Sequence, residues 1–245
     1  MQNKVAWVTG GTGGIGTGIC RELADAGYQV VAGYSNAEKA KAWQEEQKAV
    51  GYDFAISQAD VTSFDSVSKS YAEIKEQLGP VSVLVNNAGI TADGMLKKMG
   101  FDQWQSVIST NLDSVFNTSK SCLEDMLAQG FGRIINISSI NGEKGQMGQT
   151  NYSAAKAGMH GFTKALAQET ARKGITVNTI SPGYIATDMI MKIKEEIREG
   201  IKAQIPVGRF GEPEDIARIV VFLADEKSSF ITGANISANG GQFMH

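Results

Sequence analysis

Residues 9–16 read Thr9-Gly10-Gly11-Thr12-Gly13-Gly14-Ile15-Gly16, and this glycine-rich stretch decides the fold. It follows an apolar run, Val5–Thr9, and opens a stretch of helical pattern, Gly14–Ala26. Glycines at such a place allow a tight turn and let the backbone approach a pyrophosphate, which the helix N-terminus then holds through free N–H groups. A kinase-type P-loop is excluded because no Gly-Lys-Ser/Thr closes the motif. The stretch therefore predicts a strand–turn–helix unit that binds a dinucleotide; the alternative is a glycine-rich turn without a ligand.

The rest of the chain alternates short β-branched runs with helical stretches. We expect strands at Val5–Thr9, Gln29–Gly33, Phe54–Ser57, Val83–Asn86, Ile134–Ser138, Thr176–Ser181 and near Asn235–Ser237. Helices are expected at Gly14–Ala26, Ala37–Val50, Ser66–Leu78, Phe101–Gln129, Tyr152–Lys173 and Pro213–Ala224, with glycines just past most of them (Gly27, Gly51, Gly79, Gly130 and Gly174). The central strands are continuous apolar runs, as a parallel sheet covered on both faces requires. The sequence therefore predicts an α/β fold of the Rossmann type, a doubly wound parallel sheet with helices on both faces, in a single domain over residues 1–245.

Residues 187–212 interrupt this alternation. They predict a small helical excursion, Met189–Ile201, that ends in the stretch Pro-Val-Gly-Arg-Phe-Gly at residues 206–211. An insertion after the carboxyl end of a strand lies beside the ligand crevice of such a sheet. We therefore expect residues 187–212 to form a small helical lid over the ligand.

Composition excludes several other classes of protein. The net charge is only −3, from 23 basic and 26 acidic residues without long runs of one sign, which argues against nucleic acid or anionic membranes as partners. No apolar run approaches the roughly 18 residues of a membrane span, and the N-terminus lacks the pattern of a signal peptide. Two histidines and two cysteines are too few for a metal cluster, so we expect no metal. We expect Cys20 and Cys122 to be buried in helices, in a reducing compartment, the cytoplasm.

Three further motifs follow the glycine-rich turn, whose spacing is Gly10-x-x-x-Gly14-x-Gly16. Asp60-Val61 follows the third strand, Asn86-Asn87-Ala88-Gly89 ends the fourth, and Pro182-Gly183 follows the sixth. With these motifs in this order, residues 4–241 resemble the short-chain dehydrogenase/reductase family. The resemblance implies a nicotinamide cofactor held by Gly10, Gly13, Gly14, Ile15, Gly16, Asp60, Val61, Asn87, Ala88, Gly89, Tyr152, Lys156, Pro182, Gly183 and Ile185.

The end of the second strand bears on the choice between NAD and NADP. An acidic residue there would bind the ribose 2′-hydroxyl of NAD and repel the 2′-phosphate of NADP. Here residues 31–36 read Val-Ala-Gly-Tyr-Ser-Asn, without an acid, and Lys39 follows. We expect NADP(H), with Tyr34 and Lys39 near its 2′-phosphate; a solvated helix lysine is the alternative interpretation of Lys39. The basic residue that many NADP-dependent members of the family carry inside the turn is missing, since Thr12-Gly13 stands there.

Tyr152 and Lys156 predict the proton-transfer chemistry. They stand four residues apart at the start of a predicted helix, so they share one helical face. A free tyrosine has a pKa of about 10 and is a poor acid or base near neutrality. A neighbouring ammonium lowers that pKa, and the charge of the oxidised nicotinamide would add to the effect. Tyr152 is then the expected proton donor to a ketone, although a Tyr-x-x-x-Lys spacing alone is common.

Two more residues complete the predicted catalytic set. Ser139 follows the fifth strand, where this architecture places ligands, and the resemblance assigns it the role of polarising the substrate carbonyl. Ser138 is the neighbour to test for the same role. Asn111, within a predicted helix where asparagine is intrinsically unfavourable, matches the remaining catalytic position of the family. Its implied role is to hold a water in a proton relay to Lys156.

The segment Asn141–Asn151 lies between the serine and the tyrosine, so it must line the pocket. Together with residues 181–189, Ser-Pro-Gly-Tyr-Ile-Ala-Thr-Asp-Met, it resembles members of the family that reduce acetoacetyl-CoA to (R)-3-hydroxybutyryl-CoA with NADPH in polyhydroxybutyrate synthesis. The resemblance implies substrate contacts at Asp93, Gln146, Met147, Gln149, Tyr184 and Lys194.

Two alternatives remain. Members of the family that reduce 3-oxoacyl thioesters of acyl-carrier protein often carry a basic residue just before the Gly-Arg that opens the fifth strand. Here Phe131 precedes Gly132-Arg133, which weakens that interpretation, although Arg172 and Lys173 remain basic. A non-catalytic NADP-binding sensor is a more remote alternative, because such a protein is expected to lose the tyrosine or the lysine. The resemblance also implies a homotetramer, with Phe101–Gln129 and Tyr152–Lys173 at one interface.

Overall fold

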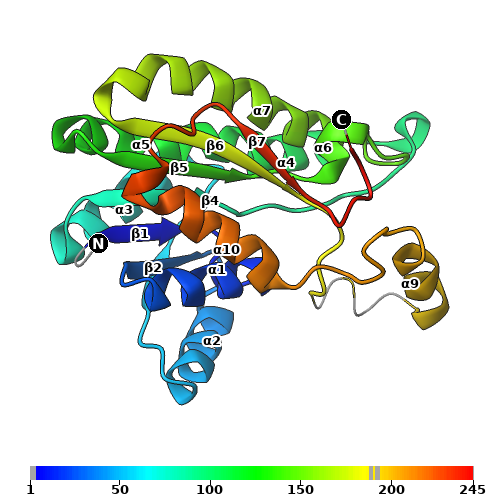
Figure 1. Cartoon of the computed structure of the whole chain (residues 1–245), viewed down its shortest axis with the longest axis horizontal. Helices are drawn as coiled ribbons and strands as arrows, with labels where there is room; N and C mark the ends of the chain where they lie inside the picture. The colour runs from blue at the N-terminus through cyan, green and yellow to red at the C-terminus, as the bar shows by residue number, and fades with distance from the viewer. Residues whose placement is uncertain (1–3, 188–189, 191–193, 245) are drawn as a thin grey trace.

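One parallel sheet organises the molecule. The computed structural model describes residues 4–187, 190 and 194–244, and within them seven strands lie in the order β3-β2-β1-β4-β5-β6-β7 (Figure 1). Every neighbouring pair is parallel. The strands are β1 (Val5–Val8), β2 (Gln29–Tyr34), β3 (Ala55–Gln58), β4 (Val81–Asn86), β5 (Gly132–Ile137), β6 (Ile175–Pro182) and β7 (Asn235–Ala238). The strand order reverses between β1 and β4, which creates a crevice at their carboxyl ends.

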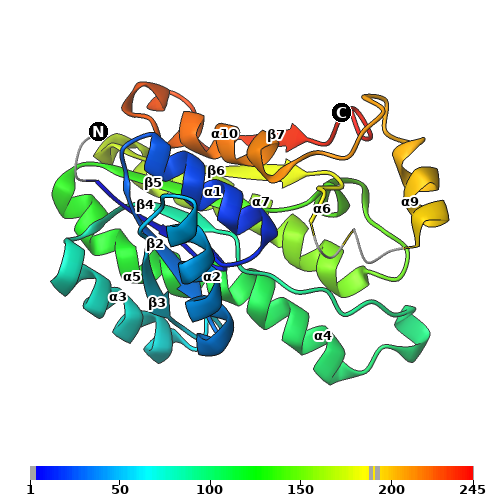
Figure 2. The same cartoon turned by 90° about the horizontal axis from the view of Figure 1, so that it is seen from below.

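Helices cover both faces of the sheet, as Figures 1 and 2 show. One face carries α1 (Gly14–Asp25), α2 (Ala37–Ala49) and α10 (Pro213–Ala224). The other carries α3 (Phe64–Leu78), α4 (Phe101–Ile108), α5 (Ser114–Gln129) and α7 (Thr150–Thr170). Every residue of β1, β4, β5 and β6 is buried, because helices exclude water from both sides. The predicted fold class, an α/β doubly wound parallel sheet with helices on both faces, is confirmed.

Local sequence explains where several helices begin and end. The side chain of Asn36 accepts a hydrogen bond from the backbone N–H of Lys39 at the start of α2, and that of Ser63 caps α3 in the same way. Gly130 ends α5 with a φ of 64°, a left-handed conformation that residues with a Cβ avoid. As predicted, Cys20 and Cys122 lie buried in helices, α1 and α5.

The helix predicted at Phe101–Gln129 is wrong as a single element. A π-helical turn, η2 (Ser109–Asp113), separates α4 from α5. The side chain of Asn111 donates from Nδ2 to the carbonyl of Val107, one turn earlier, and also to that of Ile90, outside the helix. A polar side chain that donates to helical carbonyls competes with the regular backbone hydrogen bonds of an α-helix. This competition accounts for the wider, π-helical turn at η2.

Two segments near the substrate side also differ from the sequence pattern. A short helix, α6 (Ile140–Lys144), stands where we expected only a loop. In the predicted helical excursion the described part contains α9 (Glu195–Lys202), at the carboxyl edge of the sheet (Figure 1). Residues 188–189 and 191–193 of that excursion lie outside the described residues. No helix in the described part of the chain is long and apolar enough to span a membrane.

Candidate active site

The glycine-rich turn is held by the motif that ends β4. The hydroxyl oxygen of Thr9 accepts from the backbone N–H groups of Asn87 and Ala88, both at 3.0 Å. In return, Nδ2 of Asn87 donates to the carbonyls of Thr9 and Gly10 at 3.1 and 3.0 Å. A Cβ at Gly16 would lie 2.2 Å from the carbonyl oxygen of Gly10, so only glycine lets α1 start so close to the turn. The two motifs therefore form one rigid cradle at the switch point of the sheet.

The N-terminus of α1 faces a cleft of ≈ 570 Å³. No side chain caps this helix and its first turn contains no acidic residue, so the N–H groups that a helix leaves unpaired stay available to an anion. Fourteen of the predicted cofactor residues line this cleft: Gly10, Gly13, Gly14, Ile15, Gly16, Tyr34, Lys39, Asn87, Ala88, Gly89, Tyr152, Lys156, Pro182 and Gly183.

Asp60 and Val61 line an adjoining cavity of ≈ 350 Å³ at the β3 side. It shares Gly10, Tyr34 and Ala88 with the cleft, so the two form a continuous groove along the carboxyl edge of the sheet. Ile185 lies elsewhere: it is buried, and it lines two other cavities, one of them on the substrate side.

The charge of the cleft suits an anionic ligand. Among the described residues that line it, none carries a carboxylate, whereas Lys39 and Lys156 carry amines. Ser35 and Asn36, which were not predicted as contacts, line it beside Tyr34. Their position directly after β2 is the signal that could have identified them. A dinucleotide phosphate fits this cleft, since the glycine cradle admits its backbone and the lining amines match its charge.

Tyr152 and Ser139 meet where two cavities join. Both line the cofactor cleft and also a second cavity of ≈ 480 Å³. Ser139 lies two residues after β5 and caps α6, and its hydroxyl oxygen accepts from the N–H of Asn141 at 3.1 Å. The hydroxyl of Ser138 instead donates to the backbone carbonyl of Lys156 at 2.9 Å. A group bound at the junction therefore meets the hydroxyls of Tyr152 and Ser139 together.

Lys156 and Asn111 converge on Gly89 from behind this junction. The amine of Lys156 is buried, donates to the carbonyl of Ile137 at 2.8 Å and lies 5.5 Å from the centroid of the Tyr152 ring. A Cβ at Gly89 would lie 2.5 Å from Oδ1 of Asn111 and 3.5 Å from Nζ of Lys156. Oδ1 of Asn111 is buried without a hydrogen-bond partner among the described residues. The structure therefore brings all four predicted catalytic residues to one place and leaves an acceptor there.

The protonation states differ from the sequence expectation. Burial raises the pKa of Tyr152, a hydrogen bond from Ser139 opposes this, and the carboxylate of Asp93 adds to the rise. Burial also lowers the pKa of Lys156 to about 7, so the amine is partly neutral near neutrality. From the sequence we expect Lys156 and the charge of the oxidised nicotinamide together to lower the pKa of Tyr152; in the chain without cofactor that pKa is raised, and the expectation for the bound state stays a prediction.

The second cavity contains most of the predicted substrate residues. Asp93, Gln146, Met147, Gln149 and Tyr184 all line it. Nε2 of Gln149 donates to the carboxylate of Asp93, and Nδ2 of Asn141 donates to Oε1 of Gln149, both at 2.9 Å. Because a carboxylate only accepts, Asp93 fixes the orientation of both amides. Apolar residues that were not predicted, Ile140, Ile190 and Ile201, complete the lining.

Lys194 is the predicted substrate residue that the structure keeps apart. It is exposed at the start of α9 and lines none of the five cavities found in the described part of the chain. Its position depends on the tertiary placement of the excursion, which the sequence pattern does not determine.

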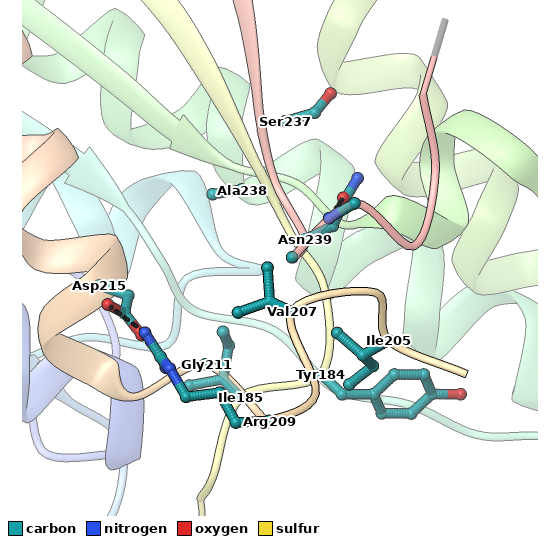
Figure 3. A pocket seen from close by; sticks show the side chains of 12 residues that line it. Tyr184, Ile185, Ile205, Val207, Arg209, Gly211, Asp215, Ser237, Ala238 and Asn239 are labelled. Carbon is teal, nitrogen blue, oxygen red and sulfur yellow. Dashed lines mark hydrogen bonds and ion pairs between the residues drawn. The ribbon is translucent and has the colours of Figure 1, made fainter. Parts of the chain in front are cut away.

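A smaller cavity of ≈ 270 Å³ lies behind Tyr184, between β7 and the segment after α9 (Figure 3). Val207 and Ile205 form an apolar wall, and the ion pair between Arg209 and Asp215 borders it at 2.6 Å. Figure 3 shows the ring of Tyr184 pointing away from this ion pair. The shared residues Tyr184 and Ile185 separate this cavity from the substrate side.

His160 connects the catalytic helix to the ends of two strands. Its Nε2 lies 3.0 Å from the hydroxyl of Ser138 and 3.3 Å from that of Ser181. Both hydroxyls already donate elsewhere, Ser138 to the carbonyl of Lys156 and Ser181 to Oδ1 of Asn235. Nε2 must therefore carry the hydrogen and donate to both.

The same chain of hydrogen bonds ends at α6. Nδ2 of Asn235 donates to the carboxylate of Glu143 at 2.6 Å, and the hydroxyl of Ser237 donates to the same oxygen. Glu143 thereby orients the amide of Asn235, which in turn orients Ser181. A directed polar chain thus joins α6, β7 and β6 to the helix that carries Tyr152.

The fold and the site define a class of protein. A cradle for an anionic dinucleotide, with a tyrosine hydroxyl at its junction with a second cavity, is the arrangement of an oxidoreductase that acts on a CH–OH group or its ketone. The family model described as "short chain dehydrogenase" matches residues 4–198, and the chain belongs to this family. The resemblance seen in the motifs is thereby confirmed.

Named relatives match the whole chain. It is 54% identical to an acetoacetyl-CoA reductase of Cupriavidus necator over 245 residues, which cover 100% of each chain. It is 56% identical to an acetoacetyl-CoA reductase of Rhizobium meliloti, over 99% of this chain and 100% of the relative. A 3-oxoacyl-[acyl-carrier-protein] reductase of Pseudomonas aeruginosa is 45% identical, over 100% of this chain and 99% of the relative.

Proposed function

We propose that this protein reduces acetoacetyl-CoA to (R)-3-hydroxybutyryl-CoA with NADPH, as a step of polyhydroxybutyrate synthesis. The observation that carries the proposal is the junction of the two cavities, which Ser139 and Tyr152 line from both sides. A ketone held there would contact two hydroxyl groups while its carbon faces the cofactor cleft. Relatives named acetoacetyl-CoA reductase, more than half identical over the full length, support this choice of substrate.

The chain's own residues supply proton transfer and charge stabilisation. When bound, the nicotinamide supplies the hydride. Ser139 donates a hydrogen bond to the substrate oxygen, where negative charge develops, and Tyr152 donates the proton. Lys156 supports proton transfer at Tyr152, and Oδ1 of Asn111, which has no partner among the described residues, would hold a water in the proton relay to Lys156. The raised pKa of Tyr152 keeps the hydroxyl protonated near neutrality, as a proton donor for reduction requires.

The residues at the end of β2 and at the start of α2 support NADP(H) rather than NAD(H). The end of β2 offers Tyr34, Ser35 and Asn36 to the cleft, and Lys39 lines it from the first turn of α2. A 2′-phosphate would meet an amine and the N-terminus of a helix there, and no described residue that lines the cleft carries a carboxylate to repel it.

The surroundings of Phe131 bear on which thioester carrier the protein accepts. The ring of Phe131 lies 3.4 Å from Nζ of Lys4 and 4.3 Å from the guanidinium carbon of Arg133. Lys4 also pairs with Glu226, and Arg133 is buried, so neither cation presents an open charge to an acidic carrier protein. This favours coenzyme A over acyl-carrier protein as the carrier.

Both cysteines are free and buried, which is consistent with action in a reducing cytoplasm. We also propose a homotetramer, because large apolar side chains are exposed along α4 and α5. Residues 187–212 are proposed as a lid, of which α9 is the described helix.

Two assays test the proposed function. Tyr152→Phe removes the proton donor, so turnover should fall at least about 10²-fold while NADPH still binds. Wild-type turnover in this variant would refute the mechanism. The second assay compares NADPH oxidation with acetoacetyl-CoA and with acetoacetyl-acyl-carrier protein. A higher kcat/KM on the carrier-protein thioester would make that ester the substrate.

A further inference from the structure

Tyr184 lies in a segment, residues 183–187, that the structure describes outside any helix or strand. Its ring reaches the wall between the substrate cavity and the smaller cavity behind it. Two backbone bonds tie this segment to Gly211: the N–H of Gly211 donates to the carbonyl of Tyr184 at 2.9 Å, and the N–H of Ala186 donates to the carbonyl of Gly211 at 2.7 Å. The position of Gly211 therefore bears on where Tyr184 lies.

Gly211 can approach this segment because it has no side chain. A Cβ there would lie 2.6 Å from Cδ1 of Ile185, and the two residues form an isolated parallel bridge. Figure 3 shows both residues between Tyr184 and the ion pair of Arg209. Because the link consists of backbone bonds at close contact, a displacement of Gly211 moves the segment with it.

The ion pair between Arg209 and Asp215 closes the turn that contains Gly211. The guanidinium donates twice to the carboxylate, at 2.6 and 3.2 Å, and once to the carbonyl of Phe210 at 2.9 Å. Oδ2 of Asp215 also accepts from the N–H of Glu212 at 2.8 Å, within the capping box that begins α10. Hydrogen bonds from Arg209 and from this N–H hold the pKa of Asp215 below its ordinary value, so the pair is charged near neutrality.

The helix that carries Asp215 is itself fixed beside the cofactor cradle. A Cβ at Gly18 of α1 would lie 2.7 Å from Cβ of Pro213, the first residue of α10, so the two helices are in close contact. A paired arginine and carboxylate fix geometry as well as charge. Half of the Arg209 side chain is exposed, and exposed ion pairs contribute little to overall stability. The effect of this pair is therefore expected in local position.

We propose that Arg209 is a positioning residue for substrate binding, which holds Tyr184 at the wall of the substrate cavity through Gly211. This inference rests on the proposed function and extends it to a residue outside the substrate cavity. Of the five cavities found in the described part of the chain, Arg209 lines the smaller one behind Tyr184. Loss of the ion pair should raise KM for the thioester more than it lowers kcat, because Tyr152 and Ser139 lie on other elements.

Arg209→Met removes the guanidinium and keeps the stem of the side chain. Its KM for acetoacetyl-CoA should rise about fivefold, near the upper value for an exposed ion pair, with kcat little changed. Arg209→Lys restores a cation and should recover part of this loss, whereas Asp215→Asn should resemble Arg209→Met. Arg218→Met is the matched control, because Arg218 is an exposed cation of α10 that also acts on Asp215 through its charge alone.

A second substitution tests whether Arg209 acts through Tyr184. In a Tyr184→Ala background, Arg209→Met should change KM less than it does in the wild type, because the side chain that the ion pair positions is absent. An unchanged KM in Arg209→Met overturns the inference, and so does an equal fold-change in both backgrounds.

Hydrogen exchange separates the inference from the proposed function, because it needs no substrate. In Arg209→Met the amide of Ala186, which donates to Gly211, should exchange faster than in the wild type and in Arg218→Met. Unchanged exchange at Ala186 overturns the inference. A protein that fails to reduce acetoacetyl-CoA, with faster exchange at Ala186 in Arg209→Met, refutes the substrate alone. The same KM shift is then expected with the acyl-carrier-protein thioester, and its absence there overturns the inference.

Discussion

Lys156 is a buried amine whose protonation should be visible in the stability of the protein. Burial lowers its pKa to about 7 in the folded chain, from 10.5 when exposed. Between these values the unfolded chain binds a proton that the folded chain does not, so the free energy of unfolding rises with pH. The slope from one such group is about 1.4 kcal/mol per pH unit, and it vanishes below pH 7 and above pH 10.5.

Lys156→Met should remove this contribution. Denaturant unfolding at pH 7, 8 and 9, without cofactor, should show the wild type gaining stability relative to the variant as the pH rises. Lys164→Met, at an exposed position of the same helix, should follow the wild type. Parallel pH profiles for wild type and Lys156→Met would mean that the amine keeps its proton when buried.

Lys39 should decide the preference between the two nicotinamide cofactors. Its amine lines the cleft beside Ser35 and Asn36, and no described lining residue supplies a competing carboxylate. Lys39→Ala should weaken NADPH binding about tenfold, the usual value of one exposed charge-assisted contact, and leave NADH binding unchanged. Fluorescence titration of both cofactors measures the two dissociation constants. A solvated lysine without a role would show equal NADPH affinity in both proteins.

At the scale of elements, His160 links catalysis to the packing of the strand ends. It donates to the hydroxyls of Ser138 and Ser181, and Ser138 bonds the carbonyl of Lys156. His160→Leu leaves both hydroxyl oxygens buried without this donor, so the free energy of unfolding should fall by about 1–3 kcal/mol. Turnover should fall more than cofactor affinity, because the chain of bonds reaches Lys156 and the strand that leads to Ser139.

The pH dependence distinguishes this role from simple packing. Burial lowers the pKa of His160 below its ordinary 6.5. As the pH falls below 6.5 the unfolded chain therefore binds a proton first, and the wild type should lose stability relative to His160→Leu. Thermal melts from pH 7.5 to 5.5 measure this. A constant difference across that range would mean that His160 does not titrate as the structure indicates.

Sequence patterns predicted those elements whose signal is local. The glycine spacing at residues 10–16 requires a strand–turn–helix, and the apolar runs require a sheet covered on both faces, so the fold class followed. The break at η2 could not be predicted, because the apolar pattern of 101–129 continues through it and the cause is a bond from Asn111 to Ile90 in another segment. The short α6 and the position of Lys194 likewise depend on contacts that no local pattern records.

For the whole molecule, the exposed apolar surface argues for assembly. Phe101 of α4 is 73% exposed and Phe116 of α5 is 54% exposed, and Phe116 also contacts the ring of Phe64. Exposed aromatic side chains on these helices support an interaction surface there. These helices are the ones expected at an interface, and they lie on the face opposite α1 and α10 (Figure 2).

A tetramer with D2 symmetry is held by at least two different twofold interfaces, so damage to one should leave dimers rather than monomers. We therefore expect the wild type to be a tetramer and Phe116→Glu to be a dimer, because four buried carboxylates would lose hydration at the α4–α5 face. Light scattering after size exclusion gives both masses. Val50→Glu, an exposed apolar position at the end of α2, is the matched control and should remain tetrameric. A wild type that elutes as a monomer, or a Phe116→Glu variant that stays tetrameric, would show that α4 and α5 do not form the interface.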